Sequence, residues 1–215
     1  MLAAAAEMPI VARTRAARFM DSPSLFSGPP LSRLEKTVEN AIANGMVETT
    51  KGEYRSGHDS RTLRDALGCF ATGVTVVTCL QPDATPAGLT VNSFTSVSLD
   101  PPLLLVCLHK MAASAPALRT ANFFAINVLQ TGQQPASIRF STRDEDRFGS
   151  TPWSMGETGA PLLMDSLCVF ECERHAVYDG GDHDLLVGHV LRATFDANLD
   201  PLLYFRGRYR RLHFD

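Results

Sequence analysis

The chain has 215 residues, of which 45% are hydrophobic and 20% charged, and its formal net charge at pH 7 is −3. This length suits one domain with a substantial core, with or without an extension. The charge balance argues against a nucleic-acid surface, which carries a clustered basic excess, and no apolar run reaches the roughly 18 residues that a membrane span needs.

We expect residues 1–58 to form an N-terminal extension with one short helix at about 32–44. The first residues, MLAAAAEMPIVARTRAARF, make a poor secretory signal because a Met-Pro pair interrupts their apolar part. Within the expected helix, Ser32 and Glu35 match a capping box. Its apolar residues recur at helical spacing: Leu31, Leu34, Val38 and Ile42.

The compact domain is expected to span residues 59–215 and to open with a helix. Asp59 or Ser60 can cap this helix, and Gly73 is expected to end it. The face of this helix would consist of Leu63, Ala66, Leu67 and Phe70.

The middle of the domain is expected to alternate strands with short helices. One helix is predicted near 115–120, with Ser114 as its N-cap and Pro116 in its first turn. Another is predicted within 133–150, ahead of the charged segment STRDEDRF. Apolar and β-branched runs predict strands at 74–80, 87–99, 103–108 and 123–129.

The last third of the chain predicts a hairpin and a closing strand. The segments 167–179 and 182–195 flank a Gly-Gly pair, which is typical of a hairpin turn, and 201–212 predicts one further strand. Six or more strands with few helices indicate a mainly β fold with short helices. An antiparallel barrel is therefore expected rather than a doubly wound sheet.

The predicted strand 87–99 is unusual in its side chains. No charged residue occurs between Ala84 and Leu99, yet six polar residues fall within nine positions: Thr90, Asn92, Ser93, Thr95, Ser96 and Ser98. On one strand, Asn92, Ser96 and Ser98 would share a face. A half-exposed strand is one explanation, although an exposed face of this length would be expected to carry Lys or Glu. A wall that faces a neutral ligand is the other, and a flavin would fit it.

Several other kinds of site are not indicated. The chain has no G-x-G-x-x-G after a strand, no P-loop, no G-x-S-x-G and no H-E-x-x-H. His183 and His189 are six residues apart, about 20 Å along a strand, so they cannot share a metal, and we assign none. The odd number of cysteines, five without a C-x-x-C pair, indicates buried small residues in a reduced compartment, hence the cytoplasm.

The sequence also resembles a known family, the small flavin reductases with a flavin reductase-like, FMN-binding split-barrel domain. The resemblance covers residues 61–213 and rests on five motifs that occur in order: LRDALGCFATGVTVVT, GLTVNSFTSVSLDPPLLLVCL, FAINVL, GDHDLLVGHV and PLLYFRGRYRRL. It implies a six-stranded antiparallel split barrel that forms a homodimer. It also implies reduction of FMN or FAD by NADH or NADPH, with release of reduced flavin to a monooxygenase partner.

The resemblance also implies a flavin site. Thr90, Val91, Asn92 and Ser93 would meet the isoalloxazine and ribityl groups, and the same wall would continue along Ser96, Val97 and Ser98. Ser114 would meet the flavin phosphate, where Lys110 would supply positive charge. Further candidates for the flavin site are Phe140 and Arg143.

For the nicotinamide, the resemblance implies that His183, in the motif G-D-H, lies beside the ring and assists hydride transfer as the catalytic residue. The last strand would line the same pocket, with candidates Tyr204, Arg206 and Gly207. Two other functions stay open at this point. One is a flavin-binding storage module without turnover, and the other is a flavoprotein that reduces another acceptor such as a corrinoid.

Overall fold

The computed structural model describes residues 58–143 and 146–213, together with six residues of the N-terminal part: Ser32, Arg33, Lys36, Thr37, Asn40 and Asn44. The chain divides into two units, residues 1–54 and 55–215. In the first unit, the described residues from Ser32 to Asn40 are helical, as the predicted helix requires. The other residues of its predicted capping box and apolar face lie outside the described residues, namely Leu31, Leu34, Glu35, Val38 and Ile42.

The second unit opens with helix α3, Ser60–Leu67. Its N-cap is Asp59, whose carboxylate accepts from the backbone N–H of Thr62 at 2.9 Å, so the predicted start is confirmed. The predicted end at Gly73 is wrong. The helix ends at Gly68, because Thr72 and Gly73 leave it to pair with another strand as β1. No residue of α3 is buried, so its apolar face does not pack into a core within this chain.

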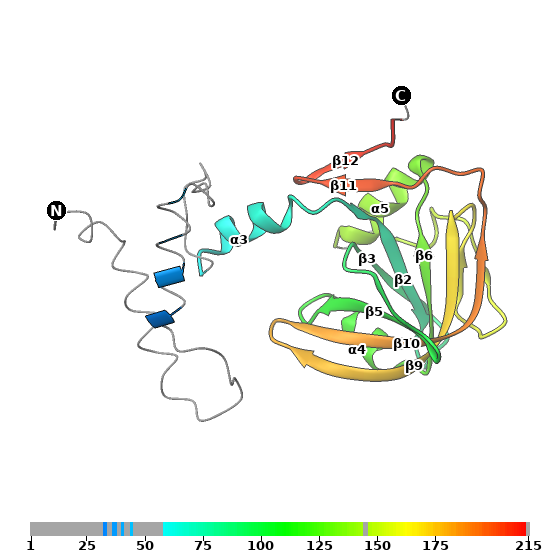
Figure 1. Ribbon diagram of the computed structural model, residues 1–215. Coiled ribbons are helices and arrows are strands. Elements are labelled where there is room, and N and C mark those ends of the chain that lie inside the picture. Colours follow the sequence, from blue (N-terminus) through cyan, green and yellow to red (C-terminus); the bar gives the residue numbers. More distant parts are fainter. Residues whose placement is uncertain are drawn as a thin grey trace. The chain divides into compact units, whose positions relative to one another are not determined.

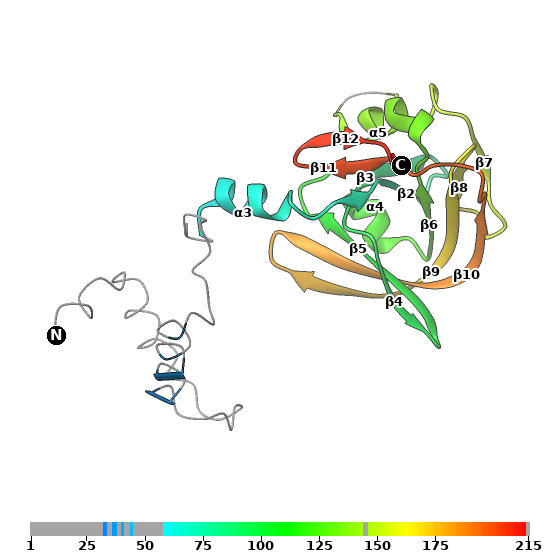
Figure 2. The same cartoon turned by 45° about the horizontal axis from the view of Figure 1, so that its top comes forward.

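A seven-stranded antiparallel sheet forms the body of this unit, in the order β3-β2-β6-β9-β10-β5-β4 (Figures 1 and 2). Its strands along the chain are β2 Thr75–Leu80, β3 Pro86–Val91, β4 Thr95–Leu99, β5 Pro102–His109, β6 Phe123–Val128, β9 Cys168–Gly180 and β10 His183–Phe195. The sheet curves strongly, and the long β9–β10 hairpin bends with it (Figure 1). The expected mainly β, antiparallel architecture is confirmed.

The polar stretch 87–99 is two strands and not the single strand predicted. Asn92, Ser93 and Phe94 leave the ladder between β3 and β4. β3 pairs with β2 and β4 pairs with β5, so the two halves lie at opposite edges of the sheet. The resemblance implies six strands, and the main sheet has seven. The expected single face shared by Asn92, Ser96 and Ser98 does not form, since a bulge between Ser96 and Ser98 also shifts the register of β4.

The predicted hairpin is confirmed. β9 and β10 pair along their whole length, and His183 lies opposite Gly180, which leaves Gly181 and Asp182 as a two-residue turn. Gly181 has φ +82°, a left-handed conformation that glycine adopts without a steric penalty.

Two small sheets complete the fold. One joins β1, Thr72–Gly73, to the hairpin β11–β12, Leu203–Phe205 and Arg208–Arg210, and the other pairs β7, Trp153–Met155, with β8, Pro161–Leu163. The predicted single closing strand 201–212 is therefore wrong. Arg206 and Gly207, at φ +49° and +74°, form a tight turn within it, which suits the right-handed twist of a two-residue hairpin.

The helices α4, Ala115–Thr120, and α5, Gln134–Ser141, pack against the sheet, and a short 3₁₀ helix, Thr131–Gln133, precedes α5. One core cluster includes Leu118 of α4 with Val77, Val106, Phe124 and Leu186 from the strands. A second includes Phe140 of α5 with Val76, Leu129 and Leu202. β2 therefore buries side chains on both of its faces. In the part of the chain that the structure describes, no helix is long and apolar enough to cross a membrane.

Candidate functional site

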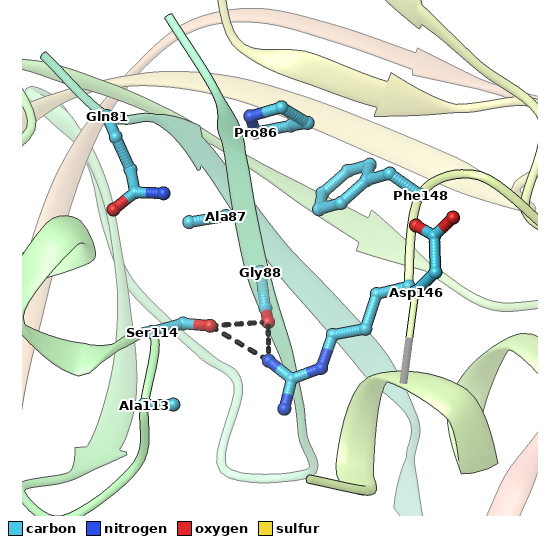
Figure 3. A pocket seen from close by; sticks show the side chains of 9 residues that line it. Gln81, Pro86, Ala87, Gly88, Ala113, Ser114, Asp146 and Phe148 are labelled. Atoms are coloured by element: carbon cyan, nitrogen blue, oxygen red, sulfur yellow. Dashed lines mark hydrogen bonds between the residues drawn. The ribbon is translucent and has the colours of Figure 1, made fainter. Parts of the chain in front are cut away.

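A cavity of about 430 Å³ opens where the start of β3, the loop before α4 and the segment 146–148 meet (Figure 3). Ser114 lies in its wall and is 7% exposed. The hydroxyl of Ser114 donates to the carbonyl oxygen of Gly88 at 2.8 Å. Ser114 is the N-cap residue of α4, as predicted, but its side chain makes no capping hydrogen bond because it is committed to β3 instead.

Arg147 supplies the positive charge of this cavity. One guanidinium nitrogen donates to the Gly88 carbonyl at 2.7 Å and to Ser114 Oγ at 2.9 Å (Figure 3). The other donates to the carbonyl of Thr142 at 2.8 Å. Sequence reasoning missed this residue. The motif STRDEDRF was recognised as a charged irregular segment, but nothing local in it distinguishes the arginine that turns inward from the one that does not.

Gly88 is required at its position by close packing against β2 and α5. A Cβ atom there would lie 2.9 Å from the carbonyl oxygen of Val77 and 3.0 Å from Cε1 of Phe140. Phe140 is fully buried, and its ring meets Phe148 edge to face with centroids 5.0 Å apart. The structure thus places Phe140 in the core behind the cavity wall. There it supports Gly88, whose carbonyl faces the cavity.

A second cavity, of about 220 Å³, lies farther along β3. It gathers Thr90, Val91, Asn92 and Tyr204, four of the predicted residues, with Val74, Ser137, Ser141 and Tyr209. Every polar group in this lining is neutral.

Internal hydrogen bonds hold that lining in place. Thr90 Oγ1 donates to the Ser137 carbonyl at 2.7 Å, and Asn92 Nδ2 donates to Thr72 Oγ1 at 3.3 Å. The hydroxyl groups of Ser137 and Tyr209 lie 2.9 Å apart. Because hydroxyl and amide oxygens can accept further bonds, these groups remain able to bind a ligand.

A third group lies at the tip of the β9–β10 hairpin. His183 Nδ1 is 2.7 Å from Asp182 Oδ1, and the rings of His183 and His109 meet edge to face with centroids 5.0 Å apart. The hydrogen bond and charge of His183 lower the pKa of Asp182 below its ordinary value of 3.8. His183 is partly exposed, and it lines neither of the two cavities along β3.

Lys110 belongs to this hairpin and not to the Ser114 cavity. Its ammonium donates to Asp179 Oδ1 at 2.8 Å and to the Gly181 carbonyl at 2.6 Å. The hydrogen bond from Lys110 is the main reason why the pKa of Asp179 lies below its ordinary value of 3.8. The cation that contacts Ser114 is therefore Arg147, where the sequence pointed to Lys110.

The residue after His183 faces the other side of β10. Asp184 is 6% exposed, and its Oδ2 atom lies 3.5 Å from Nε of Arg119 on α4. His183 therefore belongs to the hairpin tip, whereas Asp184, the next residue of β10, pairs with α4, the helix that begins after Ser114.

The remaining predicted residues lie outside these three groups. Ser93 lies between β3 and β4, and its hydroxyl bonds to the backbone of Cys107. Ser96, Val97 and Ser98 are on the edge strand β4, where Val97 is 52% exposed. Arg143 is exposed. Arg206 and Gly207 line a separate cavity, of about 390 Å³, with residues of α3 and its C-terminal end.

The described residues were also compared with what a metal site and a reactive thiol require. No group of three or more His, Cys, Asp or Glu side chains there is placed to hold a metal ion. Burial raises the pKa of both Cys79 and Cys172 to about 12, so neither thiol is activated as a nucleophile.

Comparison with known proteins decides the family. The family described as "Flavin reductase like domain" matches residues 67–213, which include both cavities along β3 and the β9–β10 hairpin. The chain belongs to this family. The resemblance found in the sequence is confirmed.

Among relatives, FMN reductase (NADH) SmoA of Agrobacterium fabrum is 46% identical over 155 residues, which are 72% of this chain and 87% of that protein. Stachydrine N-demethylase reductase subunit Stc3 of Rhizobium meliloti is 46% identical over 151 residues, 70% of this chain and 65% of that protein. The chain spans about half, 48%, of another Rhizobium meliloti relative.

A solved structure of the NADH:FAD oxidoreductase SgcE6 of Streptomyces globisporus, in complex with NAD and FAD fragments, superimposes with a TM-score of 0.73. It is 41% identical, and the alignment covers 76% of this chain and 99% of that one. The split-barrel fold expected from the sequence is thereby confirmed.

The residues of the flavin reductase-like domain fit a flavin. An isoalloxazine ring with its ribityl chain presents neutral donors and acceptors, which match the neutral lining around Thr90 and Asn92. A flavin phosphate is anionic, and the guanidinium of Arg147 beside the Ser114 hydroxyl matches that charge. The two cavities lie along one strand, since Gly88 and Thr90 are both in β3.

Proposed function

We propose that this protein is an NAD(P)H:flavin oxidoreductase that reduces FMN or FAD. The observation that carries the proposal is the arrangement along β3, since residues of this one strand line both a cavity with neutral lining and a cavity that contains Arg147. A ligand with a neutral polar ring system at one end and an anionic group at the other would match both. The named activities of SmoA, an FMN reductase (NADH), and of SgcE6, an NADH:FAD oxidoreductase, support the same class of reaction.

In this proposal the chain binds and orients the flavin through neutral groups. Thr90, Val91, Asn92 and Ser93 meet the ring and ribityl chain, while Ser114 and Arg147 hold the phosphate. Phe140 contributes by supporting Gly88 from the core. Tyr204 lines the same cavity as Thr90. Ser96, Val97, Ser98 and Arg143 line neither cavity along β3 and are kept as further candidates for the flavin site.

The hydride acceptor and donor are the flavin and nicotinamide cofactors themselves, which supply the redox chemistry. The contribution of the protein is to hold the two rings in contact and to exclude water. His183 orients the nicotinamide from the tip of the β9–β10 hairpin, and its side chain can also pass the proton that accompanies the hydride. Arg206 and Gly207 are proposed to lie near the phosphate groups of the dinucleotide.

We further propose that the protein works in the cytoplasm as a homodimer and supplies reduced flavin to a monooxygenase. Exposed apolar side chains on two strands support a dimer, since Val97, Leu99 and Phe195 are 52%, 94% and 78% exposed. The name of Stc3, an N-demethylase reductase subunit, supports a role as the reductase of a two-component enzyme.

The decisive test is to follow the absorbance of the reduced nicotinamide with each of the four pairs of NADH or NADPH with FMN or FAD. Turnover with at least one pair is expected. Flavin binding without any turnover would instead identify a storage module. Adding the companion oxygenase or a corrinoid to the working pair then separates a supplier of reduced flavin from a reductase of another acceptor.

A further inference from the structure

We infer that His109 is a positioning residue for the nicotinamide site, and that it holds the imidazole of His183 in the orientation in which Asp182 fixes its tautomer. The inference rests on the proposed function, because it concerns how His183 is presented to the reaction. His109 is the last residue of β5 and lies directly opposite His183, the first residue of β10, in the β5–β10 ladder.

The two rings are in contact and nearly perpendicular. Their centroids are 5.0 Å apart and the angle between the ring planes is 87°. Aromatic rings favour this edge-to-face arrangement because the positive edge of one meets the negative face of the other. The contact restricts rotation of the His183 ring about its side-chain bonds, since another rotamer would lose it.

Each ring is also fixed at its Nδ1 atom. Nδ1 of His109 accepts a hydrogen bond from the backbone N–H of Met111 at 3.2 Å, so in the neutral ring the proton is on Nε2. Nδ1 of His183 lies 2.7 Å from the carboxylate of Asp182, which can only accept, so this nitrogen carries a proton. Nε2 of His183 is then the nitrogen left to face a ligand.

Lys110, next to His109, holds the turn from which His183 projects. Its backbone N–H donates to the Asp182 carbonyl at 3.0 Å, and its ammonium donates to the Gly181 carbonyl and to Asp179. Both residues of the two-residue turn are thus hydrogen-bonded to Lys110. The segment His109–Lys110 therefore fixes the backbone of the hairpin tip and the ring of His183 together.

The test compares His109→Ala and His109→Phe with His175→Ala as the control. His175 is an exposed histidine on β9 of the same hairpin, away from the turn. Two readouts are used: kcat and KM for the nicotinamide and the flavin, and the ¹⁵N and ¹³C NMR signals of the imidazoles, which distinguish protonation at Nδ1 from protonation at Nε2. A thermal unfolding curve of each variant checks that it is folded.

We expect His109→Ala to lower kcat, with little change in KM for the flavin, by roughly the 2- to 13-fold that an edge-to-face aromatic pair is worth. The His183 signals should shift from the Nδ1–H form to a mixture of both forms. His109→Phe keeps an aromatic edge and should restore most of the kcat and the Nδ1–H signal. The control should match the wild-type protein in both readouts.

Wild-type kcat and an unchanged His183 signal in His109→Ala would overturn the inference. A fall in kcat that His109→Phe does not restore, with His183 still in the Nδ1–H form, would overturn it too. If the wild-type protein turned over no cofactor pair, the proposed function would fail, but the NMR comparison would still decide whether His109 sets the orientation of His183.

Discussion

Ser93 and Cys107 exchange two hydrogen bonds through one hydroxyl group: Ser93 Oγ donates to the Cys107 carbonyl at 3.1 Å and accepts from the Cys107 N–H at 2.9 Å. β4 pairs with β5 only as far as Thr95 opposite Leu105. Ser93 is thus at the position where the ladder would continue, and its side chain takes the place of the missing backbone partner. The segment between β3 and β4, which are the two edge strands of the sheet, is thereby attached to β5.

Replacing Ser93 with Ala should destabilise the protein, because both backbone groups of Cys107 would lose their partner on this side. The expected loss is about 1–3 kcal/mol of unfolding free energy, or a fall of several degrees in Tm for a chain of this size. Urea and thermal unfolding measure it. Ser154→Ala, at an exposed position on β7, is the matched control. Equal stability of the two variants would show that the Ser93 bonds contribute nothing to the barrel.

Arg147→Met should weaken the binding of FMN by roughly tenfold or more, since hydrogen bonds to charged groups are worth about 1.5–3 kcal/mol. Riboflavin lacks the phosphate, so its KM should change little. Arg61→Met, on the exposed surface of α3, controls for the loss of one charge. Measuring KM for both flavins in all three proteins isolates the phosphate effect. If Arg147→Met raised KM for riboflavin by the same factor as KM for FMN, Arg147 would have a structural role only.

His183→Ala should reduce kcat for NAD(P)H oxidation by about 10- to 100-fold, the range expected when a reactant loses its orientation. Flavin affinity should persist, because His183 lines neither of the cavities along β3. Steady-state kinetics and flavin fluorescence titration separate the two effects. Unchanged turnover in this variant would remove His183 from the mechanism.

The hairpin tip should loosen in acid. The pKa of Asp179 in the folded protein is below its ordinary value of 3.8, mainly because of the hydrogen bond from Lys110. A lowered carboxyl pKa contributes stability that is fully present above pH 3.8 and is lost as pH falls through the lower, folded value. The Gly181 amide donates to Asp179, so its NMR shift reports the titration.

Lys110→Met should move the midpoint of the Gly181 titration upward, toward 3.8. The Thr85 amide is an internal control, because it donates to Asp83, whose pKa is lowered by the hydroxyl and backbone of Thr85 and not by Lys110. A Gly181 midpoint that did not move would mean that Lys110 does not hold the turn in solution.

Deletion of residues 1–45 should leave reductase activity intact. The main sheet, the cavities and the family match all lie within residues 58–213. Size-exclusion chromatography and the nicotinamide assay on the shortened protein test this. Loss of active dimer would show that the helix predicted at 32–44 is part of the assembly.

Features determined by local sequence were predicted well. The β9–β10 hairpin follows from two long β-rich segments around a glycine pair, and the start of α3 follows from Asp59, because capping involves neighbours only three residues apart. Neutral side chains do line a cavity around Thr90 and Asn92, but the predicted face shared with Ser96 and Ser98 does not form, and binding of a flavin there stays a prediction.

Features determined by distant partners were not predicted. Ser114 was recognised as a cap, but its hydroxyl bonds to Gly88, 26 residues away. Arg147 reaches Gly88 across 59 residues, and no local pattern distinguishes it from exposed Arg143 in the same segment. The break at Ser93 was missed for the same reason, because alternation along a strand does not reveal which neighbour each half will pair with.

Successive side chains of β10 point to opposite sides of the strand, and this has a consequence for redesign of the β9–β10 hairpin. His183 faces the hairpin tip, while Asp184 is buried against Arg119 of α4, the helix that follows Ser114. Grafting the hairpin of a relative to change the preference between NADH and NADPH would also exchange the anchor of that helix. A transplanted hairpin must therefore bring a residue that pairs with Arg119. If Ser114 holds the flavin phosphate as proposed, a graft without such a residue would alter flavin affinity as well.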